Sequence, residues 1–199
     1  MSDAARSEIL PVGGADTVST AWWGMICLIA TEAILFVYLI FSYAYLGSQQ
    51  PGPWPPAGPP SLKLALPNTI ILIASSFLLG WGVLPFKRQH DKRRLILALV
   101  GTILLGAIFI TIQGFEWAGK PFVFSTNAYT SAFFILTGVH MAHVVVGVLI
   151  LTMLLIWTLM GRFGGTHHEH LALGSLYWHF VDVVWLVVFT TAYLVPQFK

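Results

Sequence analysis

Charged residues are scarce in this sequence. Only 9% of its 199 residues are Asp, Glu, Lys or Arg, and the formal net charge is +2. Such a small basic excess gives no reason to expect nucleic-acid binding. In their place, 57% of the residues are hydrophobic and the mean hydropathy is +0.79. A soluble domain of this length could not hide so much apolar surface from water, so the sequence predicts an integral membrane protein.

Cysteine is almost absent, since Cys27 is the only one in the chain. A single thiol excludes both a disulfide framework and a cysteine metal site within one chain. Cys27 lies in an apolar stretch, where we expect it to pack as a small hydrophobic residue.

Apolar residues gather in five stretches, 22–46, 68–86, 95–113, 128–159 and 171–195. At about 1.5 Å per residue, each is long enough to cross a hydrocarbon core of about 30 Å. We therefore predict an all-α, polytopic bundle of five transmembrane helices over residues 22–195. Residues 1–21 form an N-terminal segment without the features of a cleaved secretory signal, so the first span is expected in the mature protein. Residues 196–199 form a C-terminal tail.

The distribution of basic residues predicts the orientation of the bundle. Lys63 and Lys120 are the only basic residues of the first and third connections. The second and fourth connections are richer, with Lys87, Arg88, Lys92, Arg93, Arg94 and Arg162. Cytoplasmic loops carry the excess of Lys and Arg, which places the N-terminus in the cytoplasm and the C-terminal tail outside.

Five ionisable side chains lie inside the apolar stretches, where charge is costly: Glu32, His140, His143, His179 and Asp182. Counting about 1.5 Å per residue places four of them, all but His143, about 12 to 16 Å from the inner membrane face. Intramembrane Glu, His and Asp usually face protein or water and usually pair. We therefore predict a polar network within the membrane.

Three functions are compatible with such a network. A haem-binding anchor could use His140 and His179 as axial ligands. A proton-coupled transporter could move protons along Glu and His. A scaffold could use the same groups to hold helices and lipid beside a catalytic partner. The residues alone leave these three readings open.

A histidine-rich run, His167, His168 and His170 with Glu169 between them, lies in the predicted cytoplasmic connection before the fifth span. Imidazoles that titrate near neutral pH beside a carboxylate could collect protons from the cytoplasm. The alternative is a solvated loop without a specific role. Adjacent histidines in a loop rarely complete a tetrahedral metal site, so we predict no metal here.

Four strings carry a family resemblance: ATEAILF at 30–36, QGFEW at 113–117, TGVHMAHV at 137–144 and LYWHFVDVVW at 176–185. Their order and spacing resemble subunit III of the haem–copper oxidases over nearly all of residues 22–195. A chain near 200 residues with five spans resembles the short bacterial form, which lacks the first two helices of the seven-helix form.

The resemblance implies roles for individual residues. Glu32 matches the family's buried carboxylate, which reacts with hydrophobic carbodiimides and supports proton uptake. His140, His143 and His179 match residues that bind neither haem nor copper. Gln113 with Glu116, and His179 with Asp182, match polar positions of helix packing and lipid contact. No catalytic or metal-ligating residue is expected in this chain.

The resemblance also implies a function for the whole chain. It predicts a non-redox accessory subunit of a proton-pumping terminal oxidase in the bacterial plasma membrane, part of aerobic respiratory electron transport. Its partners would be subunits I and II, which hold the haem and copper, a small subunit IV where one is present, and structural phospholipid. Subunit III of a quinol oxidase and a related protein of a nitric oxide reductase are the alternatives within the broader family.

Overall fold

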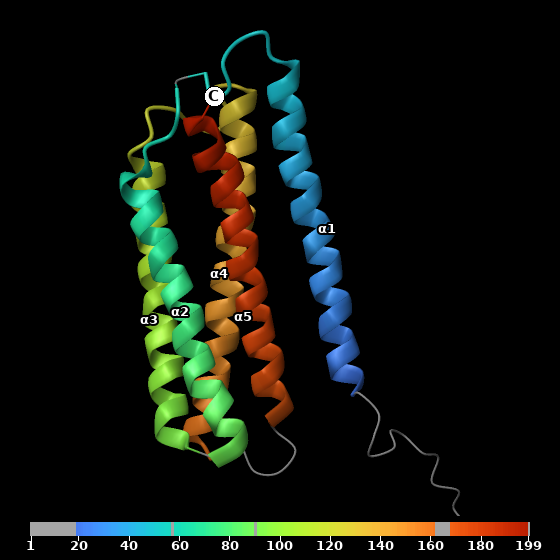
Figure 1. Cartoon of the computed structure of the whole chain (residues 1–199), viewed down its shortest axis with the longest axis vertical. Coiled ribbons are helices and arrows are strands. Elements are labelled where there is room, and N and C mark those ends of the chain that lie inside the picture. Colours follow the sequence, from blue (N-terminus) through green and yellow to red (C-terminus); the bar gives the residue numbers. More distant parts are fainter. Residues whose placement is uncertain (1–18, 57, 90, 162–167, 199) are drawn as a thin grey trace, which may run out of the picture.

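The computed structural model describes residues 19–56, 58–89, 91–161 and 168–198, and in these ranges it is helical without strands. Five helices there are long and apolar enough to cross a membrane. The helices are α1 (Thr20–Gln49), α2 (Leu62–Gln89), α3 (Lys92–Ala118), α4 (Ala128–Leu159) and α5 (His168–Phe189), followed by η2 (Thr190–Leu194) and η3 (Val195–Gln197). They run up and down in one bundle, with the α1–α2 and α3–α4 connections at the same end as the C-terminus (Figure 1).

Helix ends extend beyond the apolar stretches of the sequence. Helix α2 already begins at Leu62 and runs through Pro67, and the last turns of the chain continue as a π-helix and a 3-10 helix to Gln197. Basic residues expected in a loop between the second and third spans instead belong to the ends of α2 and α3. Only residues 90 and 91 separate these two helices, and the Asp91 side chain caps α3 by accepting a hydrogen bond from Arg94 N at 3.2 Å.

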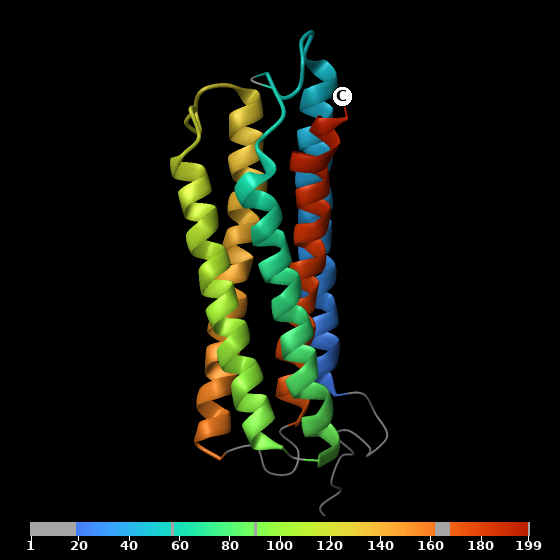
Figure 2. The ribbon, with the colours of Figure 1, turned by 60° about the vertical axis from the view of Figure 1, so that its left-hand side comes forward.

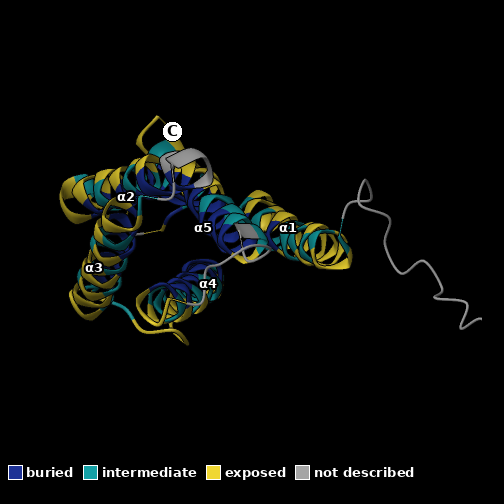
Figure 3. Cartoon of the chain, turned by 90° about the horizontal axis from the view of Figure 1, so that it is seen from below, coloured by how far each residue is buried: buried dark blue, intermediate teal, exposed yellow. Residues whose placement is uncertain are grey.

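Helix α5 lies at the centre of the bundle and α1 at its edge. In the most apolar stretch of α5 and its extension, 61% of the residues are buried. In the corresponding stretch of α1, only 6% are buried. Seen from one end, α2, α3 and α4 lie on one side of α5 and α1 stands on the other (Figure 3). In the side view of Figure 2, α1 lies behind α5. Cys27 is exposed on α1, so the expectation that it packs inside the protein was wrong. An exposed thiol on an edge helix faces the membrane or a partner rather than the core.

Glycines of α3 and α4 make room for the Trp178 ring of α5. This indole is fully buried and donates a hydrogen bond from Nε1 to Ser75 Oγ on α2 at 3.0 Å. A Cβ atom at Gly106 or at Gly147 would lie 2.8 Å from a ring atom of Trp178. Gly138, Ala142 and Gly147 of α4 are small residues, the type that permits close helix contact in membranes. Gly147 does so, whereas a Cβ at Gly138 would meet only an ordinary contact at 3.8 Å.

Candidate functional site

Glu32 of α1 and His143 of α4 lie within hydrogen-bonding distance of each other inside the membrane span. His143 Nε2 lies 2.9 Å from Glu32 Oε2, and His143 Nδ1 lies 2.7 Å from the Val139 carbonyl oxygen. A carbonyl can only accept, so Nδ1–H donates to it. The remaining nitrogen and the carboxylate therefore face each other across a single shared proton. Phe36 packs against the imidazole with ring centroids 5.0 Å apart.

This arrangement can hold a proton in either of two states. With the proton on His143, the pair is an imidazolium and a carboxylate; with the proton on Glu32, both groups are neutral. The side chains are 15% and 26% exposed, respectively, so the pair lies at the surface of the bundle and not in its core. A proton held here can be reached from outside this chain.

A second polar group joins α2 to α5. Ser76 Oγ lies 3.0 Å from His179 Nδ1 and donates a short hydrogen bond to Asp182 Oδ2. The one hydroxyl proton is used on the carboxylate, so His179 Nδ1–H donates to the serine oxygen. Asp182 is buried and its Oδ1 accepts no hydrogen bond from the described residues. Ser76 thus links His179 and Asp182, two residues that the family resemblance had already paired.

His140 is buried completely and stands apart from both groups. Its Nε2 donates to the Val181 carbonyl oxygen of α5 at 3.2 Å. The rings of Phe36, Phe109 and Trp185 surround the imidazole, with centroids 4.8 to 6.3 Å away. His140 and His179 therefore do not face each other across a space for a haem. In the described part of the chain, no group of three His, Cys, Asp or Glu residues has metal-binding geometry.

Gln113 and Glu116 lie at the other end of α3, away from the histidines. Gln113 Nε2 is 3.5 Å from the Tyr193 hydroxyl, and Glu116 Oε1 forms an ion pair with Lys120 Nζ at 2.9 Å. Sequence reasoning missed Lys120 as a partner of Glu116 because it used this residue only to predict the orientation of the bundle. Lys120 lies just beyond the end of α3, and its spacing of four residues from Glu116 was the signal that could have found the pair.

The structure thus divides the expected network into separate groups. His140 and His143 project from one side of α4, yet His140 bonds to α5 and His143 to α1. The predicted roles of these side chains remain predictions, because the geometry alone tests none of them.

The histidine-rich run lies largely outside the described residues. His167 is not described, and of His168 only the backbone is, at the start of α5. His170 is exposed, and its ring lies 5.7 Å from that of Trp157. If the run collects protons, replacing all three histidines with asparagine should slow proton uptake by the oxidase that the family resemblance implies. Stopped-flow measurement with a pH dye checks this, and an unchanged rate would identify a solvated loop.

Comparisons with known proteins agree with the fold. The family model described as "Cytochrome c oxidase subunit III" matches residues 14–196. Proteins named cytochrome c oxidase subunit 3 from Myxine glutinosa and Homo sapiens are 37% and 36% identical over 179 residues, 86% of this chain and 68% of theirs. The protein of that name from Synechocystis sp. is 37% identical over 176 residues, 86% of this chain and 74% of its own.

The match covers nearly all of the helical bundle, and the relatives share a name that denotes a subunit of an oxidase complex. This multi-pass membrane chain therefore belongs to the cytochrome c oxidase subunit III family, the accessory subunits of the haem–copper oxidases.

Proposed function

We propose that this chain is the non-redox accessory subunit of a proton-pumping oxidase in a bacterial plasma membrane. In this proposal subunits I and II hold all haem and copper, and subunit III stabilises subunit I and supports its proton uptake. The name shared by the relatives favours cytochrome c over quinol as electron donor. The single observation that carries the proposal is the Glu32–His143 pair.

The position of this pair supports a role at a subunit contact. A partly exposed carboxylate within a bilayer is costly unless protein or water covers it. Glu32 lies on α1, the helix that is least buried by the rest of the chain. A neighbouring subunit packed against α1 and α4 would cover the pair and would lie within reach of its shared proton. That arrangement supports delivery of protons to subunit I without any redox chemistry in this chain.

A groove along the same helices supports lipid retention. A cavity of about 450 Å³ lies between α1, α4 and the start of α5, with a mostly apolar lining that includes Met25, Met153 and Leu173. Its volume falls within the range of about 300–1,000 Å³ that is common for small-ligand sites. An acyl chain is the ligand that such a lining suits, so we assign a structural phospholipid to this groove.

The experiment that tests the proposal is the substitution Glu32→Ala. We expect normal assembly, because Glu32 is only partly buried, but several-fold fewer turnovers before the oxidase inactivates, because the shared proton site is lost. Turnover-dependent inactivation and proton uptake of the purified complex measure the effect. Thr31→Ala is the matched control, since Thr31 is an exposed neighbour whose hydroxyl bonds only to Leu28 O of its own helix. Equal catalytic lifetimes for the parent and the Glu32 variant would contradict the proposed function.

A further inference from the structure

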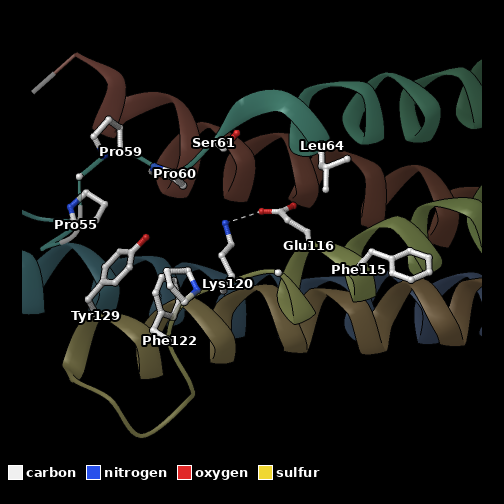
Figure 4. A pocket seen from close by; sticks show the side chains of 13 residues that line it. Pro55, Pro59, Pro60, Ser61, Leu64, Phe115, Glu116, Lys120, Phe122 and Tyr129 are labelled. Carbon is white, nitrogen blue, oxygen red and sulfur yellow. Dashed lines mark ion pairs between the residues drawn. The ribbon is translucent and has the colours of Figure 1, made fainter.

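The His179 imidazole of α5 uses only one of its two ring nitrogens within this chain. Other ionisable groups of the bundle are paired internally. At the end of α3, for example, the Lys120 and Glu116 side chains point toward one another (Figure 4) and form an ion pair at 2.9 Å. His179 Nδ1 lies 3.0 Å from Ser76 Oγ, whereas no described residue forms a hydrogen bond with His179 Nε2. This second nitrogen is available to a group outside the chain.

His179 Nε2 reaches the surface of the bundle. The side chain is partly exposed, and Nε2 is not among the unpaired polar atoms that the described residues enclose. The surroundings are apolar. Val183 lies one turn further along the same side of α5 and is 59% exposed, and Phe77, next to Ser76 on α2, is 76% exposed. A polar ring edge thus lies on an otherwise apolar face within the membrane span.

The serine-bridged cluster, which consists of Ser76, His179 and Asp182, holds three exchangeable protons when its net charge is zero, one from each side chain. A net charge is costly inside the hydrocarbon, so this state is favoured. Each of the two hydrogen bonds at Ser76 Oγ uses one proton, whichever partner donates it. The third proton therefore lies on one of the two remaining atoms, Asp182 Oδ1 or His179 Nε2.

The third proton belongs on His179 Nε2. Asp182 Oδ1 is enclosed and has no hydrogen-bond partner among the described residues, so an O–H there would be buried without an acceptor. Imidazole is also the more basic of the two groups. His179 consequently presents an N–H donor, and not a lone pair, to whatever covers this face.

An N–H donor inside the membrane requires an acceptor. Acyl chains offer none, so a donor left against lipid would lose its hydrogen bond at a considerable cost. His179 lies about three helical turns inside α5, which begins at His168, and the oxygens of lipid head groups do not reach that depth. A transmembrane helix of another protein can place a side-chain oxygen there.

We propose that the face formed by α2 and α5 docks a transmembrane helix of a neighbouring oxidase subunit, and that a side-chain oxygen of this helix accepts a hydrogen bond from His179 Nε2. The partner residue is a serine, threonine, amide or carboxylic acid among apolar neighbours, which match Val183 and Phe77. The contact rests on the membership of this chain in a family of oxidase subunits. It does not depend on the proton support proposed for Glu32.

His179→Gln and His179→Asn separate the outward hydrogen bond from the inward one. The glutamine amide nitrogen occupies the place of Nε2 and still donates outward, whereas the asparagine amide nitrogen occupies the place of Nδ1 and still donates to Ser76. The retention of this subunit by the purified oxidase, diluted in detergent, is measured by native mass spectrometry. We expect His179→Gln to bind like the parent, and His179→Asn to bind about tenfold more weakly, the usual effect of one hydrogen bond.

Thr111→Val is the matched control. Thr111 is an exposed polar residue of α3 whose hydroxyl donates only to the Ala107 carbonyl oxygen of its own helix. Its removal should leave the retention of the subunit unchanged. Any other ranking of the two His179 variants would overturn the proposal. In particular, a retained His179→Asn variant with a weakened His179→Gln variant would assign His179 to its contact with Ser76 alone.

Photochemical cross-linking identifies the partner with His179 intact, so its result does not depend on the folding of the His179 variants. Val183 is replaced by a photoreactive benzophenone amino acid, and the purified oxidase is irradiated and digested. The adduct should contain a transmembrane peptide of another oxidase subunit, attached within about one turn of a residue with a side-chain oxygen. Adducts with phospholipid alone, or with a second copy of this chain, would overturn the proposal.

Failure of this contact is distinguishable from failure of the proposed function. The affinity of the subunit for the oxidase is measured at His179, whereas catalytic lifetime is measured at Glu32 on another helix. A His179→Asn variant that dissociates more easily, but has the parent's catalytic lifetime while it remains bound, would support the docking contact by itself.

Discussion

Replacing Trp178 with alanine should destabilise the subunit by about 3–5 kcal/mol, the usual cost of removing a large buried aromatic side chain. The indole is fully buried between helices, and its Nε1–H bonds to Ser75 Oγ. Gly106 and Gly147 lie against the ring and have no side chains with which to fill the space it would leave. The loss therefore combines a cavity with one lost hydrogen bond to Ser75, whose hydroxyl still donates to the Leu72 carbonyl oxygen.

The measurement is the temperature at which the subunit dissociates from the purified oxidase. Trp23→Ala is the matched control, because Trp23 is 59% exposed on α1 and its removal leaves no internal cavity. A Trp178 variant that dissociates at the parent's temperature would show that α5 is not held through this ring. Trp178→Phe should fall between the two, since it keeps an aromatic ring but loses the hydrogen bond and part of the volume.

Hydropathy predicted the five spans because a bilayer imposes a length on every helix that crosses it. The helix ends were less predictable, since polar and basic residues also continue a helix into the interface. Lys92–Arg94 illustrate this, because a cluster assigned to a loop forms the first turn of α3. Leu62–Pro67 do so at the other end of α2, because they are helical although the apolar stretch of the sequence begins only at residue 68.

The partners of the intramembrane polar residues were less predictable than their presence. His140 and His143 are three residues apart, so they share one side of α4. This spacing does not say which neighbouring helix each of the two side chains contacts. His143 meets Glu32 of α1, and His140 meets the backbone of α5. Ser76 was invisible as a site residue, because a single serine in an apolar span has no distinctive pattern. Its role depends on the contact of α2 with α5, which only the tertiary structure supplies.

Substituting alanine for Gly82 should separate the halves of α2 and α3 that lie next to their connection. A Cβ atom at Gly82 would overlap the Ala98 side chain and lie 3.1 Å from the Arg94 carbonyl oxygen, so the backbones themselves must move. Overpacking of this kind typically costs about 1–3 kcal/mol. Alanine is the better helix former by about 1 kcal/mol, so local propensity opposes the expected loss.

Gly80→Ala is the matched control, because it lies on the same helix two residues earlier and its Cβ would have no neighbour within 4 Å. Alanine at position 80 gains the same helix propensity, and its Cβ overlaps no neighbouring atom. The Gly80→Ala variant should therefore be as stable as the parent or more stable. Thermal dissociation of the subunit, measured on both variants in the assembled oxidase, compares the two effects directly. If Gly82→Ala were as stable as Gly80→Ala, the α2–α3 pair would be able to shift without loss. Close packing at this crossing would then not be what holds the two helices together. A lower dissociation temperature for Gly82→Ala alone would instead show that the close approach of the two backbones stabilises this crossing. The comparison is direct because both variants make the same change in side-chain size and helix propensity.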